Sequence, residues 1–273
     1  MSVIGDLRDE CAALDTFVAA LDAQQWQQPT MFFGWTTYDE IIHNHYLDLL
    51  AMQAVQNPGE FTEIAADIMR RSRDDPDYSI RVDANKKFGI LTKPAALQRW
   101  RDTYQAMCAL FESRDPAERL PWFGPPMSVE ACASARQMEV WAHGQDAYDL
   151  FRVRRANQDY IHNIALLGVK TFGWSFINRR LKPPPTKPFV SLSAPSGASW
   201  SWNEAASSEQ VVGTAEDFCL VVTQRRHVDD TRLKVVGAGA RGWMEIAQCF
   251  AGDPAQGPAA GKRIVQFADG GRL

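Results

Sequence analysis

A run of three prolines at residues 183–185 divides the chain into two parts of different character. Proline lacks the backbone N–H of a helix and restricts the residue before it, so a helix ends ahead of such a run. Before the run, apolar residues recur at the three- and four-residue spacing of amphipathic helices. After it, the pattern changes to short strands and turns. The sequence therefore predicts an α+β protein, with a helical bundle over residues 1–181 and a small α+β module over residues 186–273.

Local signals bound the helices of the first part. Thr36, with Asp39 three residues later, has the form of a capping box. Ser128 is in position to cap a later helix. The charged stretch at about residues 74–90 resembles a long excursion, and its length alone is the basis for a lid hypothesis. The expected helices cover residues 5–26, 37–57, 60–73, 94–113, 129–151 and 159–180.

The second part begins with residues 189–202, in which two strand-like segments flank a Pro-Ser-Gly turn and predict a β-hairpin. Thr214 and Asp217 form a second capping box ahead of an apolar helix. Residues 232–237 predict a further strand, and residues 240–251 a last helix. The remaining tail is rich in Gly, Pro and Ala, so it is expected to be irregular.

Composition excludes several classes of function. A net charge of −4 and a pI near 5.8 argue against a nucleic-acid-binding surface. No apolar run approaches the roughly 18 residues of a membrane span, and the start of the chain lacks an export signal. We therefore expect a cytoplasmic protein without a membrane partner, either a monomer or a homodimer. The five cysteines are dispersed without a C-x-x-C pair, which indicates buried thiols.

The candidate functional residues are His43, Glu139 and His143. Glu139 and His143 are four residues apart, so an α-helix places both side chains on one face. Imidazole and carboxylate groups together suit zinc, nickel or iron, and three such ligands leave positions open for water or substrate. The spacing alone is weak evidence, because Glu–His pairs four residues apart arise often by chance. An Arg136–Glu139 salt bridge within the helix is the alternative explanation for the carboxylate. Asp146 shares the face of Glu139 and His143, and is a candidate catalytic residue.

Two segments carry a resemblance to a known family. WTTYDEIIH, residues 35–43, resembles the W-T-x-x-D-hydrophobic-x-x-H segment of DinB-like proteins, and more closely the mycothiol-dependent maleylpyruvate isomerase group. RQMEVWAHGQD, residues 136–146, resembles that group's R-x-x-E-x-W-x-H-x-x-D helix. The chain as a whole resembles the group's uncharacterised metal-binding subfamily, through APSGASWSW, VVGTAEDFCLVVTQRR and AQCFAG.

The resemblance implies a DinB-like four-helix bundle that binds a divalent metal, usually zinc, through His43, Glu139 and His143. It implies a C-terminal module similar to sterol-carrier-type domains. It also implies a low-molecular-weight thiol cofactor such as mycothiol, whose thiolate adds to a small electrophilic substrate. An arginine of the C-terminal module is expected to hold a substrate carboxylate. Arg225 and Arg226 stand at the matching helix end, where basic residues also stabilise a helix C-terminus without any role in catalysis.

Three functions follow from these observations. The first is a thiol-dependent isomerase or S-transferase, in which His43, Glu139 and His143 act as metal ligands. The second is a hydrolase or lyase that uses a metal-bound water, with Asp146 or Tyr46 as candidate base. The third is a non-catalytic module that binds a small ligand, which would require a deep apolar tunnel within residues 186–273.

Overall fold

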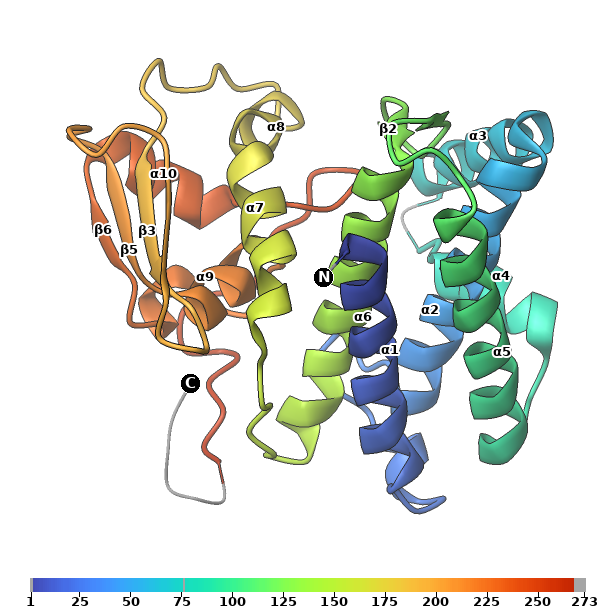
Figure 1. Cartoon of the computed structure of the whole chain (residues 1–273). Helices are drawn as coiled ribbons and strands as arrows, with labels where there is room; N and C mark the ends of the chain where they lie inside the picture. Colours follow the sequence, from blue (N-terminus) through green and yellow to red (C-terminus); the bar gives the residue numbers. More distant parts are fainter. Residues whose placement is uncertain (1, 76, 268–273) are drawn as a thin grey trace. The chain divides into compact units, whose positions relative to one another are not determined.

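The chain folds into two compact units, Met1–Leu150 and Phe151–Leu273 (Figure 1). The computed structural model describes residues 2–75 and 77–267. The sequence pattern suggested a boundary at the proline run of residues 183–185, but the boundary between the two units lies earlier, after Leu150. The helical segment before the prolines therefore belongs to the second unit. None of the described helices combines the length and apolar character that a membrane-spanning segment needs.

The first unit is a four-helix bundle, as predicted. Helix α1 packs against α5 and α6, and α2 packs against the same two helices from the other side. Helices α3 and α4 pack on the outer side of α2, and a short antiparallel ribbon of β1 and β2 precedes α6. The bundle helices are α1 (Val3–Ala19), α2 (Thr37–Gln56), α5 (Lys93–Glu112) and α6 (Val129–Leu150). The other elements are η1 (Gln25–Gln27), α3 (Pro58–Asp74), α4 (Ile80–Phe88), β1 (Arg119–Leu120) and β2 (Met127–Ser128).

The helix starts follow the predicted caps. Thr36 and Asp39 form a reciprocal capping box at the start of α2. The hydroxyl of Ser128 accepts a hydrogen bond of 3.1 Å from the backbone N–H of Ala131 in the first turn of α6. The first helix ends at Ala19, before the predicted limit, and the 3₁₀ turn η1 covers the end of the expected span.

The stretch expected as a long excursion contains helix α4. Arg71 at the end of α3 makes two hydrogen bonds of 2.7 Å to the carboxylate of Asp83 in α4. The hydroxyl of Tyr38 donates to the backbone carbonyl of Gly89, just after α4, at 2.8 Å. The segment is therefore tied to α2 and α3 by specific contacts, and the prediction of an irregular stretch was wrong. Two of its charged residues, Asp83 and Arg81, form ion pairs with Arg71 on α3 and Asp39 on α2.

The second unit contains a four-stranded sheet with the order β4-β3-β5-β6. The predicted hairpin is present as β3 and β4, and β5 lies parallel to β3 on its other side. Strand β5 was not predicted. The strands are β3 (Phe189–Ser193), β4 (Ser199–Trp202), β5 (Gln210–Thr214) and β6 (Lys234–Val236). The helical elements are η2 (Asp159–Ile161), α7 (His162–Lys170), α8 (Phe172–Ile177), α9 (Ala215–Val222), η3 (Val228–Asp230) and α10 (Ala238–Ile246).

Packing explains why α7 and α8 belong to the second unit. Helix α7 approaches α9 so closely at Gly168 that an added Cβ would lie 2.9 Å from side-chain atoms of Phe218 and Val222. In α8, the ring of Phe172 meets the ring of Trp243 edge to face, with 5.2 Å between centroids. Figure 1 shows α7 beside α9 within this unit. The single helix expected over residues 159–180 is thus two helices that break at Thr171.

Candidate metal centre

Helices α2 and α6 bring together the three predicted ligands. The Nε2 atom of His43 lies 3.5 Å from Oε2 of Glu139, and Nε2 of His143 lies 3.4 Å from the same oxygen. Each residue offers one nitrogen or oxygen atom within 4.8 Å of the others. The i,i+4 spacing of Glu139 and His143 produces this convergence on α6, and the α2–α6 packing supplies His43.

A fully buried ion pair fixes the register of these two helices. Nε of Arg136 on α6 donates to Oδ1 of Asp48 on α2 at 2.9 Å, and both side chains have no exposed area. Nη2 of Arg136 donates to Oδ1 of Asn44 at 3.1 Å, and Nε1 of Trp100 donates to the second oxygen of Asp48 at 3.0 Å. Arg136 therefore pairs with Asp48, and the alternative of a salt bridge to Glu139 is not what the structure contains.

Two aromatic rings form a wall against the imidazoles. Trp35 stacks on His143, with 5.6 Å between centroids and 14° between planes, and contacts His43 at 5.2 Å. Phe32 meets His143 edge to face at 5.1 Å. Both come from the turn before α2, which is closed by a backbone hydrogen bond of 2.7 Å from Thr30 to Trp35. The wall holds both imidazoles in place and shields one side of the site from water.

The three candidate ligands differ in exposure and charge. The Glu139 side chain is 21% exposed, whereas those of His43 and His143 are 8% and 6% exposed. Burial by itself would raise the pKa of Glu139, but hydrogen bonds and charge interactions with His143 and His43 outweigh it and hold that pKa well below its usual value. The site thus presents an ionised carboxylate on its most accessible side.

Glu40 is a residue of this site that the sequence pattern did not reveal. Its Oε2 lies 2.6 Å from Nδ1 of His143, and its Oε1 accepts a hydrogen bond of 2.9 Å from the hydroxyl of Thr30. The signal was a carboxylate only one turn before His43 on a helix whose first half is almost wholly buried. Asp39, expected to cap the helix, does form the cap, and its Oδ2 also lies 3.3 Å from Nη1 of Arg81.

Asp146, the predicted catalytic residue on α6, is 1% exposed. One of its oxygens lies within 4.8 Å of atoms of Glu40 and His143, and the three form a second cluster with potential metal-binding atoms. His45, two residues after His43, lies apart from the site. Its ring stacks on Phe88 at 4.2 Å, and its Nε2 is 3.0 Å from the hydroxyl of Thr103.

The donor set fits a divalent cation. Glu139 is an ionised carboxylate, yet among the described residues its partners are the two imidazoles and it has no lysine or arginine partner. A carboxylate in this setting needs a positive charge. Two imidazole nitrogens and one carboxylate oxygen are ligands that zinc, nickel and iron accept.

In the second unit, Arg225 and Arg226 follow the end of α9, where Gln224 adopts a positive φ of 58°. Both side chains are buried. Nη1 of Arg225 donates to the carbonyl of Thr223, and Nη1 of Arg226 to the carbonyl of Arg225, each at 2.8 Å. These contacts fix the backbone turn that follows α9.

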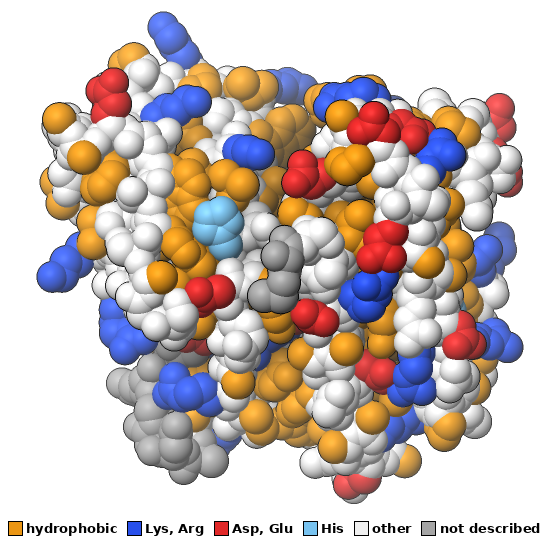
Figure 2. Space-filling view, in the orientation of Figure 1, with side chains coloured by type: hydrophobic (Ala, Val, Ile, Leu, Met, Phe, Trp, Pro, Cys, Tyr) orange, Lys and Arg blue, Asp and Glu red, His pale blue; other side chains and the backbone are white. Residues whose placement is uncertain are grey.

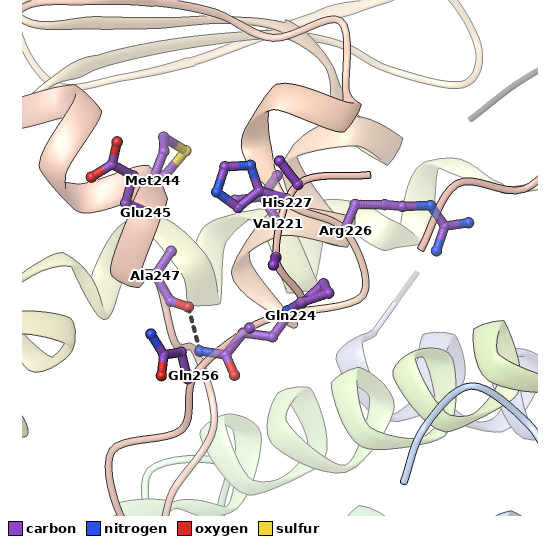
Figure 3. A pocket seen from close by; sticks show the side chains of 12 residues that line it. Val221, Gln224, Arg226, His227, Met244, Glu245, Ala247 and Gln256 are labelled. Atoms are coloured by element: carbon purple, nitrogen blue, oxygen red, sulfur yellow. Dashed lines mark hydrogen bonds between the residues drawn. The ribbon is translucent and has the colours of Figure 1, made fainter. Parts of the chain in front are cut away.

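A pocket of about 600 Å³ lies at this end of the second unit (Figure 3). Its wall combines charged and amide side chains with apolar ones, among them Arg226, His227 and Glu245, while Arg225 is not part of it. Figure 3 shows the guanidinium of Arg226 pointing away from His227 and Gln224. The lining of this pocket is therefore mixed and not wholly apolar. On the face in Figure 2, acidic and basic side chains are interspersed.

The chain is similar to a known protein family, to two proteins of known sequence and to two solved structures. The family described as "Mycothiol maleylpyruvate isomerase N-terminal domain" matches residues 7–148. Two uncharacterized proteins of Mycobacterium tuberculosis, from strains CDC 1551 / Oshkosh and H37Rv, are each 38% identical over 254 residues, 93% of this chain and 97% of the relative. The crystal structure of the mycothiol-dependent maleylpyruvate isomerase has a TM-score of 0.51 at 11% identity, covering 82% of this chain and 88% of that chain. The crystal structure of a histidine-to-alanine mutant of that isomerase has a TM-score of 0.52 at 11% identity. The match covers 83% of this chain and 89% of the mutant chain.

Proposed function

This chain belongs to the mycothiol maleylpyruvate isomerase N-terminal domain family, and from that premise we propose that it is a metal-dependent enzyme that uses a low-molecular-weight thiol cofactor. The reaction is an isomerisation or S-transfer on a small electrophilic carbonyl compound or acid. The metal is a divalent ion, with zinc favoured and nickel or iron as alternatives, held by His43, Glu139 and His143.

One observation carries the proposal. Glu139 is an ionised carboxylate whose partners, among the described residues, are two imidazoles. A structural role would be met by a permanent cation such as arginine, and Arg136, one turn away, pairs with Asp48 instead. The arrangement of two nitrogens and one oxygen around a shared point is that of a site with ligand positions left open.

A divalent metal held by His43, Glu139 and His143 would supply a Lewis acid that lowers the pKa of a coordinating thiol. The residues of the chain exclude water from the site, leave one side open and support the ligands. Trp35 and Phe32 close one side of the site to water, and the side on which Glu139 is exposed is where cofactor and substrate enter. Asp146 is buried beside Glu40, so we assign it to the support of His143 and not to contact with substrate.

For the substrate we propose a carboxylate recognised by an arginine of the second unit. Arg226 is part of the pocket wall after α9, with its guanidinium directed away from His227 and Gln224, and Arg225 adjoins it in sequence. A guanidinium offers paired N–H donors that match a carboxylate, which a lysine cannot do. Replacing each arginine by lysine separates the two candidates: the substrate-binding one raises KM for an acid substrate, and the other leaves KM unchanged.

The primary test is metal content of the purified protein by elemental analysis, together with calorimetric titration of mycothiol and other small thiols. Wild type is expected to hold close to one metal per chain and to bind one thiol. His43→Ala and His143→Ala should remain folded and lose the metal. The matched control is His45→Ala, which removes an imidazole from the same helix outside the site and should retain the metal.

Undiminished metal in both ligand variants would refute the site. Metal without thiol binding would refute the thiol-dependent activity and favour a hydrolase or lyase that uses bound water.

A further inference from the structure

We propose that Glu40 is a positioning residue that fixes the ring of His143 and determines which of its nitrogens faces the metal. This inference rests on the proposed function, because it concerns how the metal is held. Its basis is a chain of side-chain contacts from Thr30 through Glu40 to His143, all in the described part of the first unit.

The contacts in this chain are short and buried. Oε2 of Glu40 lies 2.6 Å from Nδ1 of His143, and Oε1 of Glu40 accepts from the Thr30 hydroxyl at 2.9 Å. Glu40 is 1% exposed and Thr30 is 5% exposed. Both oxygens of the carboxylate are therefore engaged, one by the imidazole and one by the hydroxyl, and the carboxylate has a fixed orientation.

A carboxylate accepts hydrogen bonds, so the nitrogen of His143 that faces Glu40 is a donor. Nδ1 thus carries a proton, so Nε2, which lies 3.4 Å from Oε2 of Glu139, is the nitrogen that would coordinate a metal. A carboxylate behind an imidazole fixes its tautomer and orientation, and increases its strength as a ligand.

The same residues also allow a different arrangement, a second cation held by Glu40, His143 and Asp146. The distance of 2.6 Å between Nδ1 and Oε2 is that of a direct charge-assisted hydrogen bond. In addition, the Thr30 hydroxyl already occupies the other oxygen of Glu40. The geometry therefore favours one metal per chain, with Glu40 acting through His143.

The test uses Glu40→Gln, Glu40→Asp and Thr30→Val in the full chain. Zinc affinity is measured by competition with a chromophoric chelator, and the cobalt(II)-loaded proteins are compared by visible absorption spectra. Glu40→Gln keeps the size of the side chain but removes its charge, and is expected to weaken zinc binding roughly 10- to 100-fold and to change the cobalt spectrum. Glu40→Asp should recover part of the affinity, and Thr30→Val should lose less than Glu40→Gln.

Asp15→Asn is the matched control, because Asp15 is also a buried carboxylate with a side-chain partner, in its case Arg101 at 2.8 Å. It should lower the thermal midpoint without changing zinc affinity or the cobalt spectrum. This separates a loss of bundle stability from an effect on the metal.

Four outcomes overturn the inference. Zinc affinity and a cobalt spectrum unchanged in Glu40→Gln would refute the role of Glu40 and leave the proposed metal centre standing. Two metals per wild-type chain, with one lost in Glu40→Gln, would make Glu40 a ligand itself. A wild-type protein that takes up no metal would refute the proposed function, and the role of Glu40 with it. If Glu40→Gln does not fold, the other two variants decide. Wild-type zinc affinity in both Glu40→Asp and Thr30→Val would refute the positioning role of Glu40.

Discussion

Replacing Arg136 by methionine tests whether the buried pair with Asp48 holds α2 and α6 in register. The change removes the guanidinium but keeps an unbranched apolar side chain in a position with no exposed area. It leaves the Asp48 carboxylate buried, with Trp100 as its remaining side-chain hydrogen-bond donor among the described residues. Removing one partner of a buried ion pair costs about 3–5 kcal/mol, because the other charge loses its compensation. At roughly 2–4 °C per kcal/mol for a unit of this size, the thermal midpoint should fall by about 6–20 °C.

The loss of stability in Arg136→Met should depend on pH in a defined direction. Burial raises the pKa of Asp48, while the charge and hydrogen bond of Arg136 lower it. Without Arg136 the pKa rises further, so the folded variant binds a proton that the unfolded chain releases. Its stability therefore decreases as pH rises, and the deficit relative to wild type should be smaller near about pH 6 than near about pH 8.

The assay is urea unfolding followed by far-UV circular dichroism at both pH values. It compares wild type, Arg136→Met, Asp48→Leu and the double variant. Replacing both charges by apolar groups should restore most of the stability. A deficit below about 1 kcal/mol in Arg136→Met, or a double variant no more stable than either single one, would refute the argument.

Other features give further expectations. Burial raises the pKa of the Cys108 and Cys132 thiols to about 12, so native protein should resist a thiol reagent near pH 8 and react fully only when unfolded; rapid native labelling would contradict this. The same raised pKa values make stability decrease as pH rises above about 9. Gly168→Ala should destabilise the second unit by about 1–3 kcal/mol, because the new methyl meets Phe218 and Val222; an unchanged thermal midpoint would show that α9 moves aside freely. Removing metal with a chelator should lower the thermal midpoint but leave the helical signal at room temperature intact, and a loss of that signal would place the metal among the requirements for folding.

The features that the sequence predicted correctly depend on short-range rules. The capping box of Thr36 and Asp39 involves contacts within one turn, and so does the shared face of Glu139 and His143. The four-helix bundle followed from apolar periodicity and from the resemblance of the two motifs. Whether these side chains bind metal is still a prediction.

The features that were missed depend on tertiary contacts. Strand β5 is defined by its pairing between β3 and β6, and its Gly213 weakens the strand pattern. Helix α4 contains many charged residues, and its Asp83 faces Arg71 across a helix pair. The extent of the second unit depends on how closely α7 approaches α9, which periodicity does not reveal. The role of Glu40 depends on a helix distant in sequence.

The ring contacts around the imidazoles also affect the entropy of ion binding. Trp35 and Phe32 restrict the rotamers of His43 and His143 in the metal-free chain, and the carboxylate of Glu139 retains the most exposure. Immobilising a side chain on binding costs about 0.5–1.5 kcal/mol. For the two histidines this ordering takes place during folding and not at the encounter with the ion. Preorganisation of this kind lets a set of three protein ligands retain a metal tightly while positions remain free for exchange of cofactor and substrate.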